Sequence, residues 1–312
     1  MKYKITVAVI TYNPNMLKLK ATLKSILMQK NIEYNVVLAD DGSSEAIDWD
    51  SIEKLFKEHG VKDYLIKKNE KNQGTVKNLY SGLDFADSEY IFTISPGDML
   101  FDDYTLSDVY EYCKDKEECA FFFGRAIYYQ NNNGDIIVGE TQFPKLPHIY
   151  DYNKLPWLIT STAYFSRQHI CGAAYFYRTK EFKKHVKEII DFGVKDVEDY
   201  TTPAIYILDY NQVIFFDRNV IWYESDTGVS GSRNKKWDAI LNEDMTRLKY
   251  YLKENYGEMP IVKAKYGGLV KRIEHPIISL VATSIIIASK LKKNIPDVDQ
   301  SDITRIRKLL II

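Results

Sequence analysis

Short apolar runs alternate with helical patterns along the first hundred residues. Residues 5–10 form a nearly continuous β-branched run, which is typical of a strand buried on both faces of a parallel sheet. Apolar residues then recur at helical spacing from Met16 to Met28. Strand-like runs follow at 35–39, 64–66 and 90–94, with helical patterns at 52–56 and 76–85 between them. This alternation predicts an α/β fold: a mostly parallel sheet flanked by helices on both faces.

The pattern is less regular between residues 101 and 235. Residues 121–123 and 126–129 predict strand, and the turn residues 131–135 lead into a return strand at 136–138, which together indicate a hairpin. Residues 141–160 contain three prolines and predict a loop or lid. Further elements are expected as a strand at 173–177, a helix at 180–192, a helix at 202–210 and a strand at 213–216.

The C-terminal region, 236–312, is expected to be a helical appendage with a membrane contact. Residues 277–291 are almost wholly apolar, Pro276 suits a first helical turn, and lysine and arginine residues flank the run. A spanning helix needs about 20 apolar residues, and this run is shorter. It is therefore either a buried packing helix or a helix lying in a membrane surface. The basic and then apolar end, 305–312, favours the membrane surface.

Composition narrows the class of protein. The 312 residues carry 42 Lys and Arg against 43 Asp and Glu, a net charge of -1, so we expect no nucleic-acid partner. Three cysteines without a CxxC pair argue against a disulfide scaffold or a zinc finger and suit a reducing cytoplasm. The N-terminus lacks the apolar core of a secretory signal. We therefore expect a cytoplasmic protein, peripheral at the inner face of the cell membrane.

Polar residues follow three of the predicted strands. They are Thr11-Tyr12-Asn13, Asp40-Asp41-Gly42-Ser43 and Ser95-Pro96-Gly97-Asp98. Ligands of open α/β sheets bind outside the carboxyl ends of the strands, so these clusters are expected to meet in one crevice. Neither GxGxxG nor GxxxxGK[ST] is present, which disfavours a dinucleotide site and excludes a P-loop. Paired carboxylates can bind a base or ribose or hold a divalent ion, although Asp and Gly also favour plain turns.

Three motifs together resemble the family 2 glycosyltransferases of the GT-A fold. They are residues 9–13 (VITYN), 38–44 (LADDGSS) and 72–78 (NQGTVKN), and the match covers roughly residues 4–230. The resemblance implies inverting transfer of a sugar from a nucleoside-diphosphate sugar, with a UDP-sugar favoured. It places Thr11, Tyr12 and Asp41 near the base, and Asn72, Gly74 and Lys77 along the donor pocket. The other donor-binding residues expected are Asn13, Asp40, Gly42, Ser43, Asn78, Ser95 and Asp98.

The resemblance also divides the chain. It implies a glycosyltransferase domain over 1–235, with a nucleotide-binding half, 1–100, and an acceptor half, 101–235. The family usually shows Asp-X-Asp-Asp after the fourth strand, whereas this chain keeps only Asp98. One carboxylate can still anchor Mg²⁺ or Mn²⁺, because diphosphate oxygens and waters complete the shell, so Asp98 is the expected metal ligand. The polar loop 225–232 contains no histidine to serve as a third ligand.

A second acidic cluster, residues 196–199, matches the Glu-Asp motif of the family. Inversion needs a base that takes the proton of the acceptor hydroxyl, and Asp199 is the expected base with Glu198 in support. The alternative is that these acids only favour the positive end of a helix dipole, and both roles can hold together.

The acceptor is expected to be a saccharide, lipid-linked because of the basic and apolar C-terminus, as in capsule, O-antigen or other surface-polysaccharide assembly. One rival hypothesis is a catalytically inactive glycosyltransferase-like binding or partner module, which the reduced acidic motif favours. Retention of Asp98, Glu198 and Asp199 speaks against it. Another rival, a nucleotidyltransferase, typically has a Gly-rich basic loop after the first strand, and this chain has none there.

Overall fold

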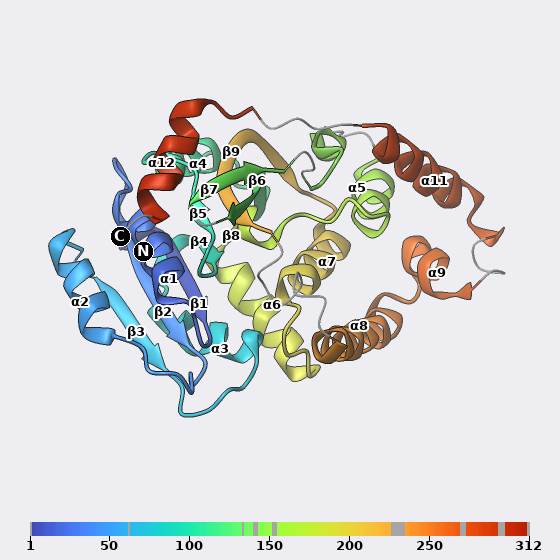
Figure 1. Ribbon diagram of the computed structural model, residues 1–312. Helices are drawn as coiled ribbons and strands as arrows, with labels where there is room; N and C mark the ends of the chain where they lie inside the picture. The colour runs from blue at the N-terminus through green and yellow to red at the C-terminus, as the bar shows by residue number, and fades with distance from the viewer. Residues whose placement is uncertain are drawn as a thin grey trace.

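The computed structural model describes residues 2–61, 63–132, 134–139, 143–151, 155–225, 235–268, 273–292 and 297–310. Over these residues nine strands form one sheet in the order β3-β2-β1-β4-β8-β6-β9-β5, with β7 paired to β6 (Figure 1). The predicted fold class, a sheet flanked by helices as in GT-A proteins, is confirmed.

The N-terminal half alternates strand and helix as predicted. Its strand β1 carries seven consecutive buried residues, because both faces of the sheet are covered. β1 pairs in parallel with β2 and β4, and β2 pairs in parallel with β3. The elements are β1 (Tyr3–Thr11), α1 (Met16–Leu27), β2 (Tyr34–Asp40), α2 (Trp49–Glu58), β3 (Tyr64–Lys68), α3 (Thr75–Gly82), a 3₁₀ turn (Leu83–Phe85) and β4 (Ser88–Ile94).

The second half completes the sheet with mixed pairings. β8 runs antiparallel between β4 and β6, while β9 runs parallel to β6. The expected hairpin is confirmed, since β6 pairs with β7. The elements are β5 (Met99–Leu100), α4 (Thr105–Cys113), β6 (Phe121–Asn132), β7 (Asp135–Val138), 3₁₀ turns (Pro147–Asp151 and Gly172–Ala174), α5 (Pro156–Phe165), β8 (Tyr175–Arg178), α6 (Thr179–Asp191), α7 (Glu198–Tyr210) and β9 (Ile214–Glu224).

Three sequence-based boundaries in this half are wrong. Residues 156–160 are not loop but the start of α5. Seven of its eight residues from 158 onward are buried, and three of these are threonine or serine, so no amphipathic pattern marks the helix. Helix α7 begins at Glu198 instead of residue 202, and Pro203 lies inside it. Strand β9 continues eight residues past 216 to Glu224, because a register shift opposite Arg125 accommodates its polar middle.

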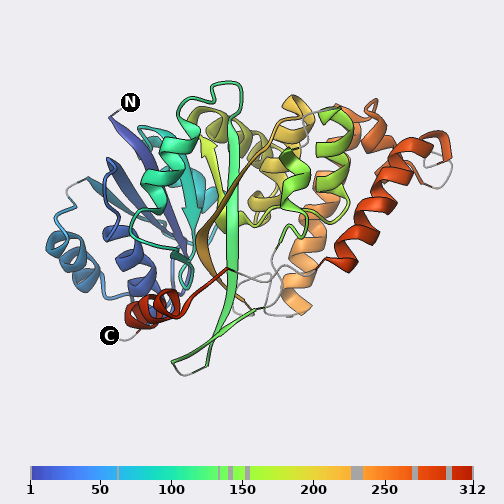
Figure 2. The same ribbon diagram turned by 90° about the horizontal axis from the view of Figure 1, so that it is seen from above.

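The C-terminal region is helical, as predicted, and divides between two places. Helices α8 (Lys235–Tyr256), α9 (Pro260–Tyr266) and α11 (Pro276–Leu291) lie on the side away from α2 and β3 (Figure 1). Helix α12 (Gln300–Leu310) instead lies beside α1 at the other end of the molecule (Figure 2). Among the described residues, no helix is long and apolar enough to cross a membrane.

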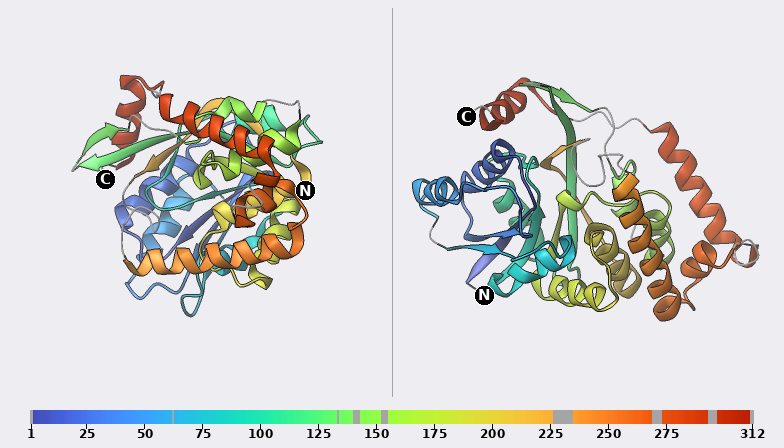
Figure 3. Two further views of the ribbon diagram at one scale, coloured as in Figure 1. Left: turned by 90° about the vertical axis from the view of Figure 1, so that its right-hand side faces the viewer. Right: turned by 60° about the horizontal axis from the view of Figure 1, so that its bottom comes forward.

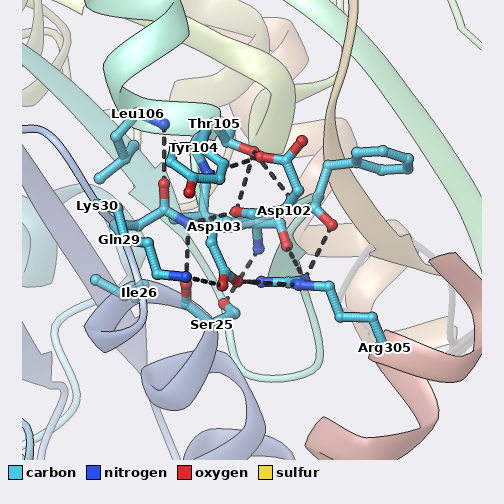
Figure 4. Close-up of polar contacts among 12 residues, drawn as sticks. Ser25, Ile26, Gln29, Lys30, Asp102, Asp103, Tyr104, Thr105, Leu106 and Arg305 are labelled. Carbon is cyan, nitrogen blue, oxygen red and sulfur yellow. Dashed lines mark hydrogen bonds and ion pairs between the residues drawn. The ribbon is translucent and has the colours of Figure 1, made fainter. Parts of the chain in front are cut away.

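Helix α12 packs on the N-terminal half. Ile306 and Leu309 are buried in a cluster with Met99, Phe101 and Trp222. Arg305 donates hydrogen bonds to the carbonyls of residues 100 and 101 and pairs with the Asp103 carboxylate at 2.9 Å (Figure 4). Arg305, Ile306 and Leu309 therefore serve internal packing, so the basic and apolar pattern of residues 305–310 does not by itself indicate a membrane contact. Residues 311–312 lie outside the described part of the chain.

We expect Ile306→Ala to lower the free energy of unfolding by about 2–4 kcal/mol, because the side chain fills a closed apolar site. Urea unfolding monitored by circular dichroism measures this change. Lys308→Ala, at an exposed position of the same helix, is the matched control and should stay within about 0.5 kcal/mol of the parent. A loss below about 0.5 kcal/mol for Ile306→Ala as well would show that the packing of α12 does not stabilise the fold.

Candidate active site

Asp41 ties the end of β2 to the loop before α3. Its buried carboxylate accepts the backbone N–H groups of Gln73 and Gly74, both at 2.9 Å. Burial raises the pKa of Asp41, and these two hydrogen bonds oppose the rise. Gly74 has φ +92 and lies against the Lys195 carbonyl, where a Cβ would come within 2.9 Å. Two predicted donor residues, Asp41 and Gly74, are thus brought together.

The loops after β1 and β2 are also joined. The Asn13 side chain accepts the N–H groups of Ser44 and Glu45, and the Asn13 N–H donates to the Ser43 hydroxyl at 2.7 Å. Asp40 accepts the Ser43 N–H and hydroxyl, which closes the turn through Gly42. A Cβ on Gly42 would come within 2.6 Å of the Lys71 backbone, so the turn requires glycine. The turns after β1 and β2 are therefore fixed to each other, and they contain four of the predicted donor residues: Asn13, Asp40, Gly42 and Ser43.

The remaining predicted donor residues divide into buried and open ones. Asn78 is 1% exposed, and its amide donates to the carbonyls of Thr11 and Ala39, so it holds the strand ends from inside. The Thr11 hydroxyl is buried and makes no hydrogen bond within the described part of the chain. The side chains open to solvent are those of Tyr12, Asn72, Lys77 and Ser95.

The turn that carries Asp98 is held from three elements. Thr22 on α1 accepts the Gly97 N–H and donates to the Asp98 carbonyl, and Tyr129 on β6 donates to the Gly97 carbonyl. The Asp98 carboxylate accepts the Glu224 N–H at 2.9 Å. Burial, followed by the neighbouring Glu224 charge, raises the pKa of Asp98 to about 8. The turn and the Asp98 carboxylate are therefore held in place by α1, β6 and β9.

Two residues of this region were missed by the sequence analysis. Glu224 ends β9 with a buried carboxylate, and Lys18 on α1 pairs with it at 2.7 Å. The sequence predicts that this strand ends at residue 216, so Glu224 is not recognised as an acidic residue at a strand end. The polar loop 225–232 begins immediately after Glu224 and could have marked the true end of the strand in the sequence. Residues 226–232 lie outside the described part of the chain.

The acidic cluster at 196–199 connects the two halves. Asp196 accepts both the N–H and the hydroxyl of Thr75 at the N-terminus of α3. Asp244 on α8, itself fully buried, accepts the N–H groups of Lys195 and Asp196. The turn before α7 is thereby fixed to the donor-side loop and to the C-terminal helices.

Glu198 and Asp199 form the first turn of α7, so the helix-dipole reading of these acids holds. Glu198 is buried, and one of its oxygens has no hydrogen-bond partner among the described residues. Burial together with the Asp199 charge raises the pKa of Glu198 well above its ordinary value. Asp199 is open to water, yet the surrounding protein desolvates it enough to raise its pKa. An accessible carboxylate with a raised pKa can accept a proton in a reaction.

Residues 171 and 172 connect Asp199 with Asp98. Gly172 lies directly against Asp199, where a Cβ would come within 2.5 Å of the Asp199 Cβ. The pKa of the buried Cys171 thiol is raised to about 12 by burial, then by the charge of Asp98, with a smaller effect of Asp199. One short segment therefore lies near both carboxylates, and the donor-side and acceptor-side acids share one region.

The side chains that could bind a divalent cation are those of Asp98 and Glu224. No group of three His, Cys, Asp or Glu side chains suited to a metal occurs in the described ranges. The Asp98 carboxylate nevertheless accepts the Glu224 N–H, and the Glu224 carboxylate fills the space beside Gly97, where a Cβ would lie 2.3 Å from its oxygen. Carboxylate oxygens are ligands that Mg²⁺ or Mn²⁺ accepts when phosphate oxygens and waters complete the shell, so Asp98 and Glu224 have the chemistry of a partial ligand set.

Comparisons with known proteins agree with this geometry. The profile of glycosyl transferase family 2 matches residues 6–175, more than half of the chain, and the chain belongs to this family. The family resemblance expected from the motifs is therefore confirmed. A search of curated proteins found no match.

Solved structures share the fold. S. aureus TarS 1–349 superposes with a TM-score of 0.53 at 17% identity, covering 92% of this chain and 88% of TarS 1–349. Its complex with UDP-GlcNAc gives 0.53 at 16% identity, with 92% and 89% covered. The mannosyltransferase PcManGT from Pyrobaculum calidifontis, bound to GDP-Man and Mn²⁺, gives 0.53 at 13% identity, with 100% and 86% covered. At these identities the likeness concerns the fold.

We expect Asp98→Asn to become more stable relative to the parent as the pH rises from 5 to 8.5. The folded pKa of Asp98, about 8, lies above the ordinary aspartate value of 3.8, so the parent loses stability over this range while the amide does not. Urea unfolding in EDTA at the two pH values measures the difference.

Asp103→Asn provides the control for this pH dependence. Burial raises the pKa of Asp103, but the hydrogen bonds from Lys30 and Arg305 lower it by more, so the pKa lies below its ordinary value. This carboxylate is then ionised in both states above pH 5, and the cost of Asp103→Asn should not change with pH. A flat difference for Asp98→Asn as well would contradict the desolvated setting of Asp98.

Proposed function

We propose that the protein is an inverting glycosyltransferase that moves a sugar from a nucleoside-diphosphate sugar, with a UDP-sugar favoured, to a saccharide acceptor. The observation that carries the proposal is Asp199, a water-accessible carboxylate with a raised pKa that lies against Gly172, next to the Cys171 segment near Asp98. The structural neighbours bound to UDP-GlcNAc and GDP-Man support the choice of donor class.

The donor is proposed to lie over the ends of β1, β2 and β4. Thr11, Tyr12 and Asp41 would contact the base, with Asn13, Asp40, Gly42 and Ser43 forming the surrounding turns. Asn72, Gly74, Ser95 and Lys77 would line the sugar-diphosphate side. The exposed Lys77 ammonium offers the diphosphate a positive charge, although without the paired donors of arginine. Asn78 would contribute indirectly by holding the strand ends.

Asp199 is proposed as the base. It takes the proton of the acceptor hydroxyl while that oxygen forms a bond to the anomeric carbon, and the opposite bond to the diphosphate breaks. The nucleoside diphosphate leaves with the bonding electrons, and the configuration inverts. Glu198 is the preceding residue, and burial together with the Asp199 charge raises the pKa of Glu198 well above its ordinary value.

A divalent cation, Mg²⁺ or Mn²⁺, is proposed at Asp98. Bound there, it would supply positive charge that stabilises the leaving diphosphate. The neighbour that contains Mn²⁺ supports such a requirement.

We expect Asp199→Asn to lower kcat about a thousandfold and to leave UDP affinity unchanged, because the amide cannot accept the proton. Transfer from a panel of nucleotide sugars, with titration calorimetry of UDP, measures both quantities. The parent rate should also fall as the pH drops through the raised pKa of Asp199.

The matched control is Asp191→Asn, an exposed carboxylate on α6, which should keep parental activity. No turnover with any donor, or an unaffected Asp199→Asn, would favour the second candidate function, an inactive binding or partner module. The reduced acidic motif, with Ser95 in place of the first acid, is the observation that keeps this second candidate.

The acceptor is proposed to be lipid-linked, at the inner face of the cell membrane in surface-polysaccharide synthesis. Helix α11 presents an apolar stripe, defined here as Ile277, Leu280, Ile287 and Leu291, all more than half exposed. Its opposite face packs on α5 and α9 through Ile278 and Ile285, and Figure 3 shows the helix along an outer edge. The exposed Lys290 and Lys292 near its end suit an anionic lipid surface.

Removing the whole C-terminus would not test this contact, because α12 stabilises the N-terminal half. We instead expect the triple variant Ile277→Ser, Leu280→Ser and Ile287→Ser to bind phosphatidylglycerol vesicles at least about tenfold more weakly. Vesicle co-sedimentation measures the change. Tyr250→Ser, at an exposed aromatic residue on α8, is the control and should bind like the parent. Parental binding by the triple variant would rule out the stripe as the membrane contact.

A further inference from the structure

Helix α8 holds the turn before α7 through two charged side chains on one of its faces. Asp244 is fully buried, and its carboxylate accepts the N–H groups of Lys195 at 3.0 Å and Asp196 at 2.7 Å. Arg247 lies beside it, with Nη1 3.2 Å from Asp244 Oδ1, and donates to the Gly193 carbonyl at 2.7 Å. A buried charge is costly unless it is paired and hydrogen-bonded, so these contacts are what allows a carboxylate at this depth.

The other side of the same turn contacts the start of α3. Asp196 Oδ1 accepts the N–H of Thr75 at 3.1 Å, and the Lys195 carbonyl accepts the N–H of Val76 at 2.8 Å. Gly74 lies against that carbonyl, where a Cβ would come within 2.9 Å. Lys195 and Asp196 therefore direct their N–H groups to α8 and their oxygens to α3. One short segment links α8 to the loop before α3, which carries the predicted donor residues.

Apolar side chains also attach α8 to the fold, where the helix lies beside α7 (Figure 1). Leu248 and Leu252 are 1% and 0% exposed and belong to the same buried cluster as residues of α6 and α7. Apolar burial stabilises the helix but has no direction, whereas hydrogen bonds have narrow angular preferences. The Asp244 carboxylate therefore fixes the orientation of two peptide groups just before Asp199, which the apolar contacts do not.

We propose that Asp244 is a positioning residue of the active site, which holds the turn before α7 so that Asp199 and the loop before α3 keep a fixed mutual arrangement. The inference rests on the proposed function, in which Asp199 is the base. It makes α8 a part of the active site, although the sequence predicts an appendage there. A base must stay within hydrogen-bond reach of the acceptor hydroxyl, and a displacement of about 1 Å can lower the rate about a hundredfold.

A purely structural role of Asp244 leads to a different expectation. Its loss would then destabilise the protein as the loss of a buried leucine does, and the folded protein would keep its loops and its chemistry unchanged. Positioning predicts instead that the turn before α7 and the start of α3 loosen together. Leu248→Ala is the matched control, because it removes apolar packing one turn further along the same helix.

The first measurement is hydrogen exchange of the full chain without nucleotide, followed by mass spectrometry of peptides covering 72–78 and 193–200. We expect Asp244→Asn to raise exchange about tenfold in both peptides, because backbone N–H groups lose a charged acceptor. Asp196→Ala should raise exchange at 72–78 alone, since it removes a carboxylate contact with α3 while the backbone N–H of residue 196 still donates to Asp244. Leu248→Ala should exchange like the parent in both peptides.

The second measurement is sugar transfer from the panel of nucleotide sugars, at a temperature where circular dichroism shows every variant folded. We expect Asp244→Asn to lower kcat about tenfold, because the base is no longer held in place. Asp196→Ala should raise the KM for the donor about threefold and keep kcat, because it loosens only the donor side. Leu248→Ala should keep both parameters, which separates positioning from a loss of folded enzyme.

The inference is overturned if Asp244→Asn exchanges at 72–78 like the parent, or if it transfers sugar with the kcat of Leu248→Ala. Should Asp244→Asn fail to fold, Arg247→Met, at a partly exposed residue, removes a contact with the turn and should raise exchange at 193–200 about threefold. Parental exchange in that variant would equally overturn the inference. A parent without transfer rejects the proposed function and this inference with it, whereas an active parent with an unaffected Asp244→Asn rejects this inference alone.

Discussion

The site depends on how the open N–H groups at the start of α3 are satisfied. Asp41 from the nucleotide-binding half accepts those of Gln73 and Gly74, and Asp196 from the acceptor half accepts that of Thr75. A helix N-terminus leaves several donors without partners, so two carboxylates from distant segments can share it. The segment that leads into the proposed base is thereby fixed to the crevice that receives the donor.

Desolvation then determines the chemistry of the acids. Asp98, Glu198 and Asp199 all have raised pKa values, chiefly because protein atoms replace water around them. Among the three, Asp199 is the accessible carboxylate, which suits proton transfer. Asp98 is held by the N–H of Glu224, which suits a positioning and charge-binding role. One physical cause thus leads to different roles because the exposure of the groups differs.

Much of the N-terminal half could be predicted from the sequence because buried parallel strands have a clear apolar signature. The clusters at Thr11, Asp41 and Asp98 were expected to converge, and their hydrogen bonds show how the first two are linked. Lys18 and Glu224 could not be foreseen, because their pairing joins α1 to the end of a strand with a polar middle. The docking of Arg305 and Ile306 was also hidden, since a basic and apolar helix has the same pattern whether it meets a membrane or a protein core.

The central claim is that donor and base meet at the ends of β1, β2 and β4. A crystal structure with UDP and Mn²⁺ tests it most directly. The account predicts the uracil beside Thr11 and Asp41, the diphosphate between Lys77 and Asp98, and the Asp199 carboxylate facing the end of the diphosphate that would carry the sugar. Nucleotide bound elsewhere, or Asp199 directed away from the diphosphate, would contradict it.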